Sequence, residues 1–248
     1  MALLRFTRVC KRFRGHDAVK DVSFEVQQAE KVTIIGPSGS GKTTLLRLAI
    51  GLERPDSGSI DVDGHRLGLD GSKPLPPRGV MGLVFQSFNL FPHMKVLRNL
   101  TLAPMSVLRL SEEVAVARAR DLLNRVGLSA FENRYPGQLS GGQQQRVAIA
   151  RALAMEPKII LFDEVTAALD PELITEVLAV MHDLALETDM AMLIVTHEMR
   201  FARGISDEVL VMDNHQIIER GKPDMIFSSP KEIRTQLFLR SVLETKAI

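Results

Sequence analysis

Three continuous apolar runs along the chain predict buried strands. They occupy residues 31–36 (KVTIIG), 158–163 (KIILFD) and 192–197 (MLIVTH). Within each run, Ile, Val and Leu stand at consecutive positions and do not alternate with polar residues. That pattern is typical of a parallel sheet covered on both faces. The sequence therefore predicts an α/β fold with a mainly parallel sheet.

A stripe of apolar residues at helical spacing lies between the second and third runs. Asp170 can cap this helix, and Pro171 suits its first position. A strand, a helix and a strand in this order form the crossover unit of parallel sheets. The stripe consists of Ile174, Val177, Leu178, Met181 and Leu184.

The region 87–157 has a different pattern. It opens with a loop rich in Phe and Asn (SFNLFPHM), and a helix is predicted from Ser111 to Val126, with Gly127 at its end. Ser140 can cap a further helix that stops before Pro157. We interpret 87–157 as an inserted α-helical subdomain, and 1–86 with 158–248 as the α/β core of one domain of 248 residues.

Alternating apolar and polar positions near the N-terminus predict antiparallel strands. The segments AVKDVSFEV (18–26) and GSIDVDG (58–64) both alternate in this way. Such strands belong to a sheet with one exposed face. We therefore expect an N-terminal antiparallel β subdomain in addition to the parallel sheet.

Composition and charge exclude several classes of protein. Lys and Arg number 31 and Asp and Glu number 30, so the net charge of +1 argues against a nucleic-acid partner and a polybasic membrane anchor. No apolar run approaches the ~18 residues that span a bilayer. The single cysteine, Cys10, rules out an internal disulfide and fits a reducing compartment. We expect a soluble, cytosolic protein.

The segment GPSGSGKT (36–43) fits the phosphate-binding pattern G-x-x-x-x-G-K-[ST]. Its glycines let several N–H groups point at phosphate oxygens, and the following helix adds the positive end of its dipole. Lys42 would reach the β- and γ-phosphates, and the Thr43 hydroxyl would bind Mg²⁺. A chance match is the alternative, but the placement between a strand and a helix favours ATP binding. The residues concerned are Gly36, Pro37, Ser38, Gly39, Ser40, Gly41, Lys42, Thr43 and Thr44.

Two adjacent carboxylates, Asp163 and Glu164, end the second apolar run. In a P-loop fold this strand lies beside the P-loop strand, so Asp163 would hold Mg²⁺, through water, and Glu164 would polarise the attacking water as general base. Mg²⁺ and Lys42 would offset the repulsion between the two acids. The alternative is an ordinary pair of acids facing solvent, which the P-loop disfavours.

The segment LSGGQ opens the helix after residue 140. Its Ser and two Gly residues form a second anion-binding helix start. A simple capped helix would need the Ser but not both glycines. One chain with two such starts binds either two anions or one nucleotide shared between two chains. The segment comprises Leu139, Ser140, Gly141, Gly142 and Gln143.

Together these motifs resemble the ATP-binding subunits of ABC transporters over nearly the whole chain. The match comprises the P-loop, LSGGQQQR as the signature, IILFDE as Walker B, the D-loop Ala168, Leu169 and Asp170, Gln86 in LVFQ as the Q-loop, and His197 in VTHE as the switch histidine. The segments QSFNLFPHM, VAIARALAMEP and THEMRFAR are most similar to importers of polar amino acids.

The resemblance implies further roles for single residues. His197 would contact the γ-phosphate, and Gln86 would act on Mg²⁺ and the attacking water. Phe13 would stack on adenine, with a plain core phenylalanine as the alternative. Asp170 keeps its role as helix cap beside its place in the D-loop. Four residues would line a groove for a membrane partner or form the subdomain core: Phe88, Phe91, His93 and Met94.

The resemblance also implies an assembly. It predicts a head-to-tail homodimer, in which each ATP lies between the P-loop of one chain and the signature of the other. The partners would be integral membrane permease subunits, with a periplasmic or surface solute-binding protein acting through them. The chain would then sit peripherally on the cytoplasmic face of the cell (inner) membrane and power uptake of a polar amino acid or related solute.

Three alternatives compete with an importer. An ABC-type ATPase of DNA repair or translation would usually carry a coiled-coil insertion or two ATPase domains, and neither pattern is found in the sequence. An exporter subunit differs from an importer only by family resemblance. A nucleotide-dependent switch is favoured only by Val165, because Glu164 and His197 are both present.

Three positions depart from the family pattern. Val165 stands where Pro is usual, and Ala167 where Ser is frequent. Pro would stiffen the loop after the general base, whereas Val leaves both carboxylates in place. His215 occupies a turn position where Gly is usual, so we expect a positive φ there at a small cost.

Overall fold

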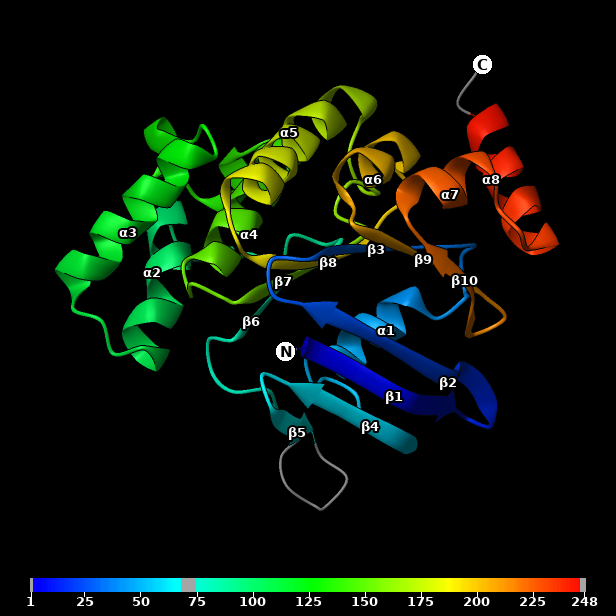
Figure 1. Ribbon diagram of the computed structural model, residues 1–248. Coiled ribbons are helices and arrows are strands. Elements are labelled where there is room, and N and C mark those ends of the chain that lie inside the picture. Colours follow the sequence, from blue (N-terminus) through cyan, green and yellow to red (C-terminus); the bar gives the residue numbers. More distant parts are fainter. Residues whose placement is uncertain (1, 68–74, 246–248) are drawn as a thin grey trace. The chain divides into compact units, whose positions relative to one another are not determined.

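The computed structural model describes residues 2–67 and 75–245, and the chain divides into two compact units (Figure 1). The first unit comprises residues 1–77 and 189–248, and the second comprises 78–188. The predicted division into a core of 1–86 and 158–248 and a helical subdomain of 87–157 stays a prediction.

The first unit contains an antiparallel sheet of order β2-β1-β4-β5 (Figure 1). Its strands are β1 (Ala2–Phe13), β2 (His16–Gln27), β4 (Ser57–Val62) and β5 (His65–Leu67). Phe6 and Phe24 face each other across β1 and β2 with ring centroids 4.7 Å apart, and each is only 2% exposed. The alternating pattern of 18–26 and 58–64 thus predicted antiparallel strands correctly.

A second set of strands in this unit is mainly parallel. The strand β3 (Lys31–Ile35) pairs in parallel with β8 (Ala191–Val195) and β9 (Glu208–Asp213). All five residues of β8 are buried, as its continuous apolar run predicts. The strand β9 turns back into the antiparallel β10 (Gln216–Gly221).

The turn between β9 and β10 has a left-handed backbone. Asn214 and His215 have φ of 46° and 66°. Two such residues between paired strands form a type I′ turn, whose twist matches that of the strands. The positive φ expected at His215 is therefore confirmed, and the His215 carbonyl accepts the Lys20 N–H at 2.8 Å.

The described part of the first unit contains four helices: α1 (Lys42–Ala49), α6 (Met199–Ile205), α7 (Pro223–Ser228) and α8 (Ile233–Thr245). One apolar cluster joins three of them to β3 and β9. It includes Ile35 and Val209 from the strands, Met199 from α6, Ile226 from α7 and Leu239 from α8, all nearly inaccessible to solvent. This burial explains why short helices remain attached to the sheet.

The second unit joins two parallel strands to a group of helices. The strands are β6 (Met81–Val84) and β7 (Ile159–Asp163). The helices are α2 (Val96–Val107), α3 (Glu112–Arg125), α4 (Gly141–Leu153) and α5 (Pro171–Glu187), with short 3₁₀ turns at Ser129–Phe131 and Pro136–Gln138. The helices α2 and α3 lie alongside each other (Figure 1).

The predicted ends of α3 are confirmed. The Ser111 hydroxyl caps this helix by accepting the Val114 N–H at 3.4 Å. The helix ends at Arg125, and Gly127 then adopts φ 69°. A left-handed glycine just past a helix satisfies its last carbonyls without a steric penalty.

The predicted cap of α5 is wrong in its chemistry. Asp170 precedes the helix, but its side chain makes no capping hydrogen bond within the described residues. The Asp170 carbonyl instead accepts the N–H of Leu173 at 2.9 Å and of Ile174 at 3.3 Å. The carboxylate is exposed and is not used to begin the helix. Of the predicted stripe, Val177, Met181 and Leu184 are buried, and Ile174 and Leu178 partly so.

None of the helices within 2–67 and 75–245 has both the length and the apolar character needed to cross a membrane.

Candidate functional site

The P-loop connects β3 to α1, and its glycines are required by close main-chain approach. A Cβ on Gly36 would overlap the carbonyl oxygen of Met212, and one on Gly41 would overlap that of Ala18. Gly36 has φ 147° and Gly41 has φ 104°, both unfavourable for other residues. The glycines therefore set the path of the loop as well as exposing its N–H groups.

The charged and polar groups of this loop suit a phosphate. Lys42 is 4% exposed, and its Nζ donates to the carbonyls of Gly36 at 2.9 Å and Pro37 at 3.0 Å. The buried Ser40 hydroxyl has no hydrogen-bond partner in the described chain. An ammonium group, a buried hydroxyl and the N-terminus of α1 together fit the phosphates of a nucleotide.

The other predicted residues of the first unit occupy accessible positions. Thr43 lies in the first turn of α1, and His197 follows β8; both are partly exposed. Phe13 at the end of β1 is 42% exposed, with Lys11 Nζ 5.2 Å from its ring centroid. A plain core phenylalanine is therefore excluded, and adenine stacking by Phe13 stays a prediction.

In the second unit, β7 ends in the two predicted carboxylates. Asp163 is 7% exposed, so it is not an ordinary solvent-facing acid. Glu164 is partly exposed and adopts φ 48°, an uncommon conformation that often marks functional sites. Its carbonyl accepts the Ala167 N–H at 3.0 Å, which makes buried Val165 the second residue of a tight turn.

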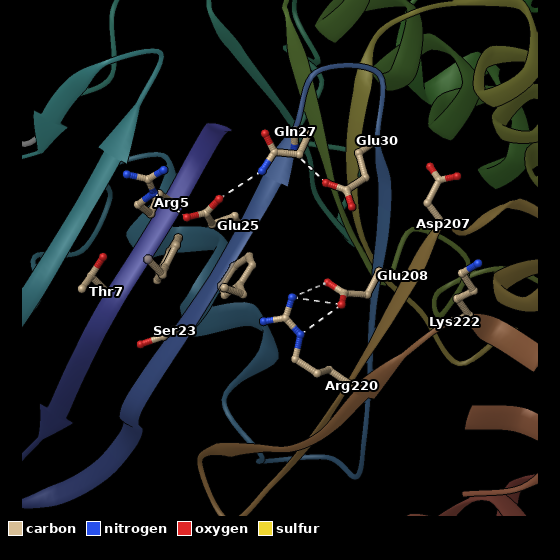
Figure 2. A pocket seen from close by; sticks show the side chains of 12 residues that line it. Arg5, Thr7, Ser23, Glu25, Gln27, Glu30, Asp207, Glu208, Arg220 and Lys222 are labelled. Atoms are coloured by element: carbon tan, nitrogen blue, oxygen red, sulfur yellow. Dashed lines mark hydrogen bonds and ion pairs between the residues drawn. The ribbon is translucent and has the colours of Figure 1, made fainter. Parts of the chain in front are cut away.

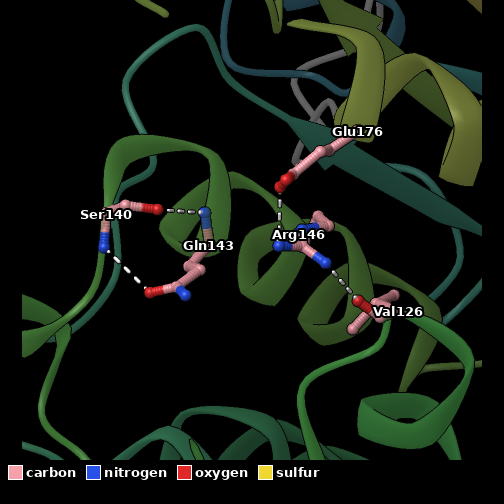
Figure 3. Close-up of polar contacts among 5 residues, drawn as sticks. All are labelled: Val126, Ser140, Gln143, Arg146 and Glu176. Carbon is pink, nitrogen blue, oxygen red and sulfur yellow. Dashed lines mark hydrogen bonds and ion pairs between the residues drawn. The ribbon is translucent and has the colours of Figure 1, made fainter. Parts of the chain in front are cut away.

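The signature helix α4 begins with a reciprocal cap (Figure 3). The Ser140 Oγ accepts the Gln143 N–H at 3.2 Å, and Gln143 Oε1 accepts the Ser140 N–H at 3.0 Å. This cap satisfies two of the four N–H groups that a helix start leaves open. The remaining two belong to Gly141 and Gly142, so the helix start is suited to an anion.

The signature glycines also have a packing role. A Cβ on Gly141 would lie 3.2 Å from Leu169 Cδ2, and one on Gly142 would lie 3.1 Å from Leu173 Cβ. The predicted D-loop and the start of α5 therefore rest closely on the start of α4. The contact at Gly142 is the more restrictive of the two, because Leu173 Cβ cannot rotate away whereas Leu169 Cδ2 is the end of a flexible side chain.

Arg146 joins α4 to two neighbours (Figure 3). Its guanidinium donates to the Val126 carbonyl at 2.9 Å and to Glu176 at 2.9 Å. The signature helix is thereby tied to α5 and to the residues after α3.

Gln86 is exposed after β6 and lines a groove of about 450 Å³. Of the four residues expected to face a membrane partner, Phe88 lines this groove, whereas Phe91, His93 and Met94 lie outside its lining. The 41% exposure of Phe91 argues against a simple core. The groove, called the loop groove below, is lined by Gln86, Ser87, Phe88, Asn89, Leu90, Pro92, Pro136, Gly137, Gln144 and Ala168.

A cavity of about 580 Å³ in the first unit is not suited to a nucleotide (Figure 2). Arg5 pairs with Glu25 at 2.6 Å, and Arg220 pairs with Glu208 at 3.0 Å. These arginines are neutralised by their own neighbours, so the wall offers little surplus positive charge for a phosphate.

Three side chains that hold the loop after β6 were not identified from the sequence. Asn99, Gln145 and Arg151 are polar residues within apolar helical patterns, and each bonds to the main chain of the loop after β6. A polar residue on the buried face of a helix was the only signal available.

Comparison with known proteins agrees with these motifs. The family model described as ABC transporter matches residues 19–167. A probable amino-acid ABC transporter ATP-binding protein of Sinorhizobium fredii is 53% identical, with 98% of each chain covered. The arginine transport ATP-binding protein ArtM of Bacillus subtilis is 48% identical, covering 97% of this chain and all of that one.

A solved structure with the same fold is the dimeric ATP-binding cassette MJ0796, in a post-hydrolysis state bound to ADP and Pi. It is 33% identical, covers 89% of this chain and 98% of its own, and superimposes with a TM-score of 0.78. The α/β fold predicted from the strand and helix pattern, with the P-loop NTPase core predicted from the phosphate-binding motif, is thus confirmed. The chain belongs to the ABC transporter family, as an ATP-binding subunit that hydrolyses ATP.

Proposed function

We propose that this chain is the ATPase subunit of an importer that drives uptake of a polar amino acid or a related solute through separate membrane subunits. Relatives that match almost the full chain at 53% and 48% identity are named as ATP-binding proteins of amino-acid and arginine transport. Their names support the solute class, and the direction of uptake is proposed from the resemblance of three segments of this sequence to importers of polar amino acids.

The first unit binds the nucleotide in this proposal. Lys42, Ser40 and the loop amides contact the phosphates, Phe13 stacks on adenine, and His197 contacts the γ-phosphate. Thr43 of the first unit and, separately, Asp163 of the second unit are proposed as Mg²⁺ ligands on their chemistry, because a hydroxyl and a carboxylate are oxygen ligands that this ion prefers. When bound, Mg²⁺ would neutralise charge on the transferred phosphoryl group.

Glu164 is the general base in this proposal. It accepts a proton from the attacking water, while Gln86 orients that water. The left-handed backbone at Glu164 and the buried neighbours Asp163 and Val165 support a carboxylate held in one place. A positioned base typically contributes ~10²–10⁴-fold to the rate.

The signature segment acts across a homodimer. Ser140, Gly141 and Gly142 of one chain bind the γ-phosphate of the ATP held by its partner. The observation that carries this step is the second anion-binding helix start in a chain with one P-loop. The dimeric state of the similar cassette MJ0796 supports it.

The membrane partners are permease subunits, and the loop groove is their docking site. A periplasmic or surface solute-binding protein acts through the permease and does not touch this chain. The chain then sits peripherally on the cytoplasmic face of the cell membrane. An exporter subunit is the alternative, and co-purification of a solute-binding protein with the permease would exclude it.

The central test is Glu164→Gln in the full-length protein. ATP binding should persist, turnover should fall by ~10²–10⁴-fold, and an ATP-bound dimer should accumulate in gel filtration. Glu172→Gln is the matched control, because Glu172 is an exposed acid in the first turn of α5. Wild-type turnover in Glu164→Gln would contradict the proposed role.

The arrangement across the dimer has its own test. A Lys42→Ala chain mixed with a Gly141→Asp chain gives a heterodimer with one site carrying both defects and one intact site. Activity in the purified heterodimer, with none in either homodimer, supports the arrangement. An inactive heterodimer whose signature segment also fails to crosslink to ATP bound by the other chain would contradict it.

A further inference from the structure

The loop of residues 85–95 has no helix or strand, and side chains from α4 hold its first half by the main chain. Gln145 Nε2 donates to the Phe85 carbonyl at 3.2 Å. Arg151 donates to the carbonyl of Asn89 at 2.6 Å and more weakly to that of Phe88 at 3.4 Å. Gln145 and Arg151 therefore hold residues 85–89 in place through hydrogen bonds to main-chain carbonyls.

The second half of the 85–95 loop is held by α2. Asn99 is 1% exposed, and its Oδ1 accepts the Phe91 N–H at 2.8 Å. Its amide nitrogen faces the carbonyls of Phe91, Met94 and Lys95 at 3.1–3.2 Å. A buried amide with several main-chain partners orders a loop strongly, because moving the loop would leave several buried polar groups without partners.

Gln86 lies between two of these anchor points. The Phe85 carbonyl is bonded to Gln145, and the carbonyls at 88 and 89 are bonded to Arg151. A chain advances at most ~3.6 Å per residue, so fixing residues 85 and 88 leaves Gln86 little freedom. Both anchors belong to α4, the helix that begins with the signature segment.

We propose that Gln145 and Arg151 are positioning residues for ATP hydrolysis, which tie the signature helix to Gln86 so that the two move together. This inference rests on the proposed roles of Gln86 and of the signature segment. A shift in the wall of the loop groove would then reach the signature helix through the side chains of Gln145 and Arg151.

The chemistry of Arg151 suits this task better than that of lysine. Its planar guanidinium presents several donors at fixed angles, which allows contact with two neighbouring carbonyls. The Phe91 ring centroid lies 5.9 Å from the guanidinium carbon. Burial lowers the pKa of Arg151 from its ordinary value, which reflects a cation withdrawn from water. A lysine would keep the charge but not the paired geometry.

A substitution at Gln145 can distinguish an effect on the positioning of Gln86 from an effect on the stability of the fold. The side chain is fully buried, and its Oε1 has no partner in the part of the chain that the structure describes. Gln145→Met removes this unsatisfied acceptor together with the bond to Phe85, so the two effects on stability oppose each other. The melting temperature should stay within about 3 °C of wild type.

The experiment measures kcat, the KM for ATP and the apparent Mg²⁺ constant of the full-length homodimer. Arg151→Lys and Gln145→Met should each lower kcat about tenfold or more, because small displacements near reacting groups are costly. The KM for ATP should stay within about twofold, since the P-loop is untouched. The apparent Mg²⁺ constant should rise, because Gln86 is a proposed ligand.

Arg118→Lys is the matched control. Arg118 also donates to a main-chain carbonyl, that of Ala154 at 3.0 Å, and pairs with Glu156 at 3.1 Å, so its described polar partners lie at the end of α4 and not in the 85–95 loop. This variant should keep wild-type kcat and Mg²⁺ dependence. If Arg118→Lys lowers kcat as much as Arg151→Lys does, the loss is a general effect of replacing an arginine, and the inference is overturned.

A double-mutant comparison decides whether the residues act through Gln86. In a Gln86→Ala background, Arg151→Lys should cause no further loss in kcat, because the effects of coupled residues are not additive. An equal loss with and without Gln86 would overturn the inference. The inference would also be overturned if Arg151→Lys and Gln145→Met both keep wild-type kcat while Glu164→Gln abolishes turnover. In that case the proposed function would still hold.

Discussion

Gly142→Ala tests the close contact between the signature helix and α5. An added Cβ would lie 3.1 Å from Leu173 Cβ and 3.5 and 3.6 Å from its Cδ2 and Cγ. The Leu173 Cβ is attached directly to the main chain of α5, so it cannot move away by rotating. Relief requires a shift of one helix against the other by a few tenths of an ångström.

Two opposing terms set the expected loss of stability. Replacing Gly by Ala stabilises by ~0.4–1 kcal/mol through the unfolded chain. Overpacking a tight contact costs ~1–3 kcal/mol. With ~0.7 and ~2 kcal/mol as central values, the net loss is ~1.3 kcal/mol. For a chain of this size that corresponds to a melting temperature ~3–5 °C lower.

Gly137→Ala is the matched control within the same unit. A Cβ on Gly137 would meet no atom of the described chain within 4 Å, and its φ is not positive. Only the unfolded-state term applies, so this variant should melt ~1–4 °C above wild type.

Differential scanning calorimetry of the two variants measures the difference, and an ATPase assay follows its effect on the signature. We expect Gly142→Ala to lose activity although the Gly142 N–H is retained, because the helix start is displaced. If Gly142→Ala melts as far above wild type as Gly137→Ala does, the packing argument is refuted.

Three further predictions concern other parts of the chain. Gly204→Ala, in α6 with open space around it, should raise the melting temperature by ~1–4 °C, and a decrease would contradict the helical environment. Val165→Pro should change turnover by less than about tenfold, or ~1.4 kcal/mol of barrier, because both carboxylates remain. Its melting temperature should rise by ~1–4 °C, since Val and Pro have the same number of side-chain carbon atoms and Pro restricts the unfolded chain; a hundredfold gain in activity would favour a nucleotide switch. Burial raises the pKa of Glu219, but bonds from the Lys231 and Glu232 N–H groups, at 2.7 and 3.2 Å, outweigh this and lower it overall. Its contribution to stability is therefore present above the unfolded pKa and lost as the pH falls below about 4.5. Thermal melts across this range should show a smaller acid-induced decrease in Glu219→Gln than in wild type, and equal decreases would exclude the effect.

Local signals made much of the fold predictable. Strands β3, β7 and β8 follow from consecutive apolar residues, and the cap at Ser140 follows from a hydroxyl before a helical pattern. The helix cap contains its own hydrogen-bond partner, whereas the strands are marked by their burial and pair with strands far away in the sequence. The P-loop and signature were predictable for the same reason as the cap, because each binds anions through its own main chain.

The contacts that escaped prediction link distant segments. Arg151 bonds to carbonyls 62 and 63 residues away, and Gln145 to one 60 residues away. A main-chain carbonyl carries no sequence signature, so no pattern in 85–95 indicated these partners. Asp170 was misjudged for a related reason: its main chain, and not its carboxylate, begins α5.

The way the 85–95 loop is held has a consequence for how such subunits diversify. Asn99, Gln145 and Arg151 bond to main-chain carbonyls, which every amino acid supplies, and Asn99 also accepts one main-chain N–H, which every amino acid except proline supplies. The Phe91 ring also approaches Arg151 and lies 6.2 Å from the His93 ring, so these two side chains add contacts of their own. Substitutions at Phe88 leave the main-chain bonds in place and can therefore alter the surface proposed to meet a membrane partner while the loop conformation persists. Gene duplicates could acquire new permeases through such changes without first losing a working ATPase.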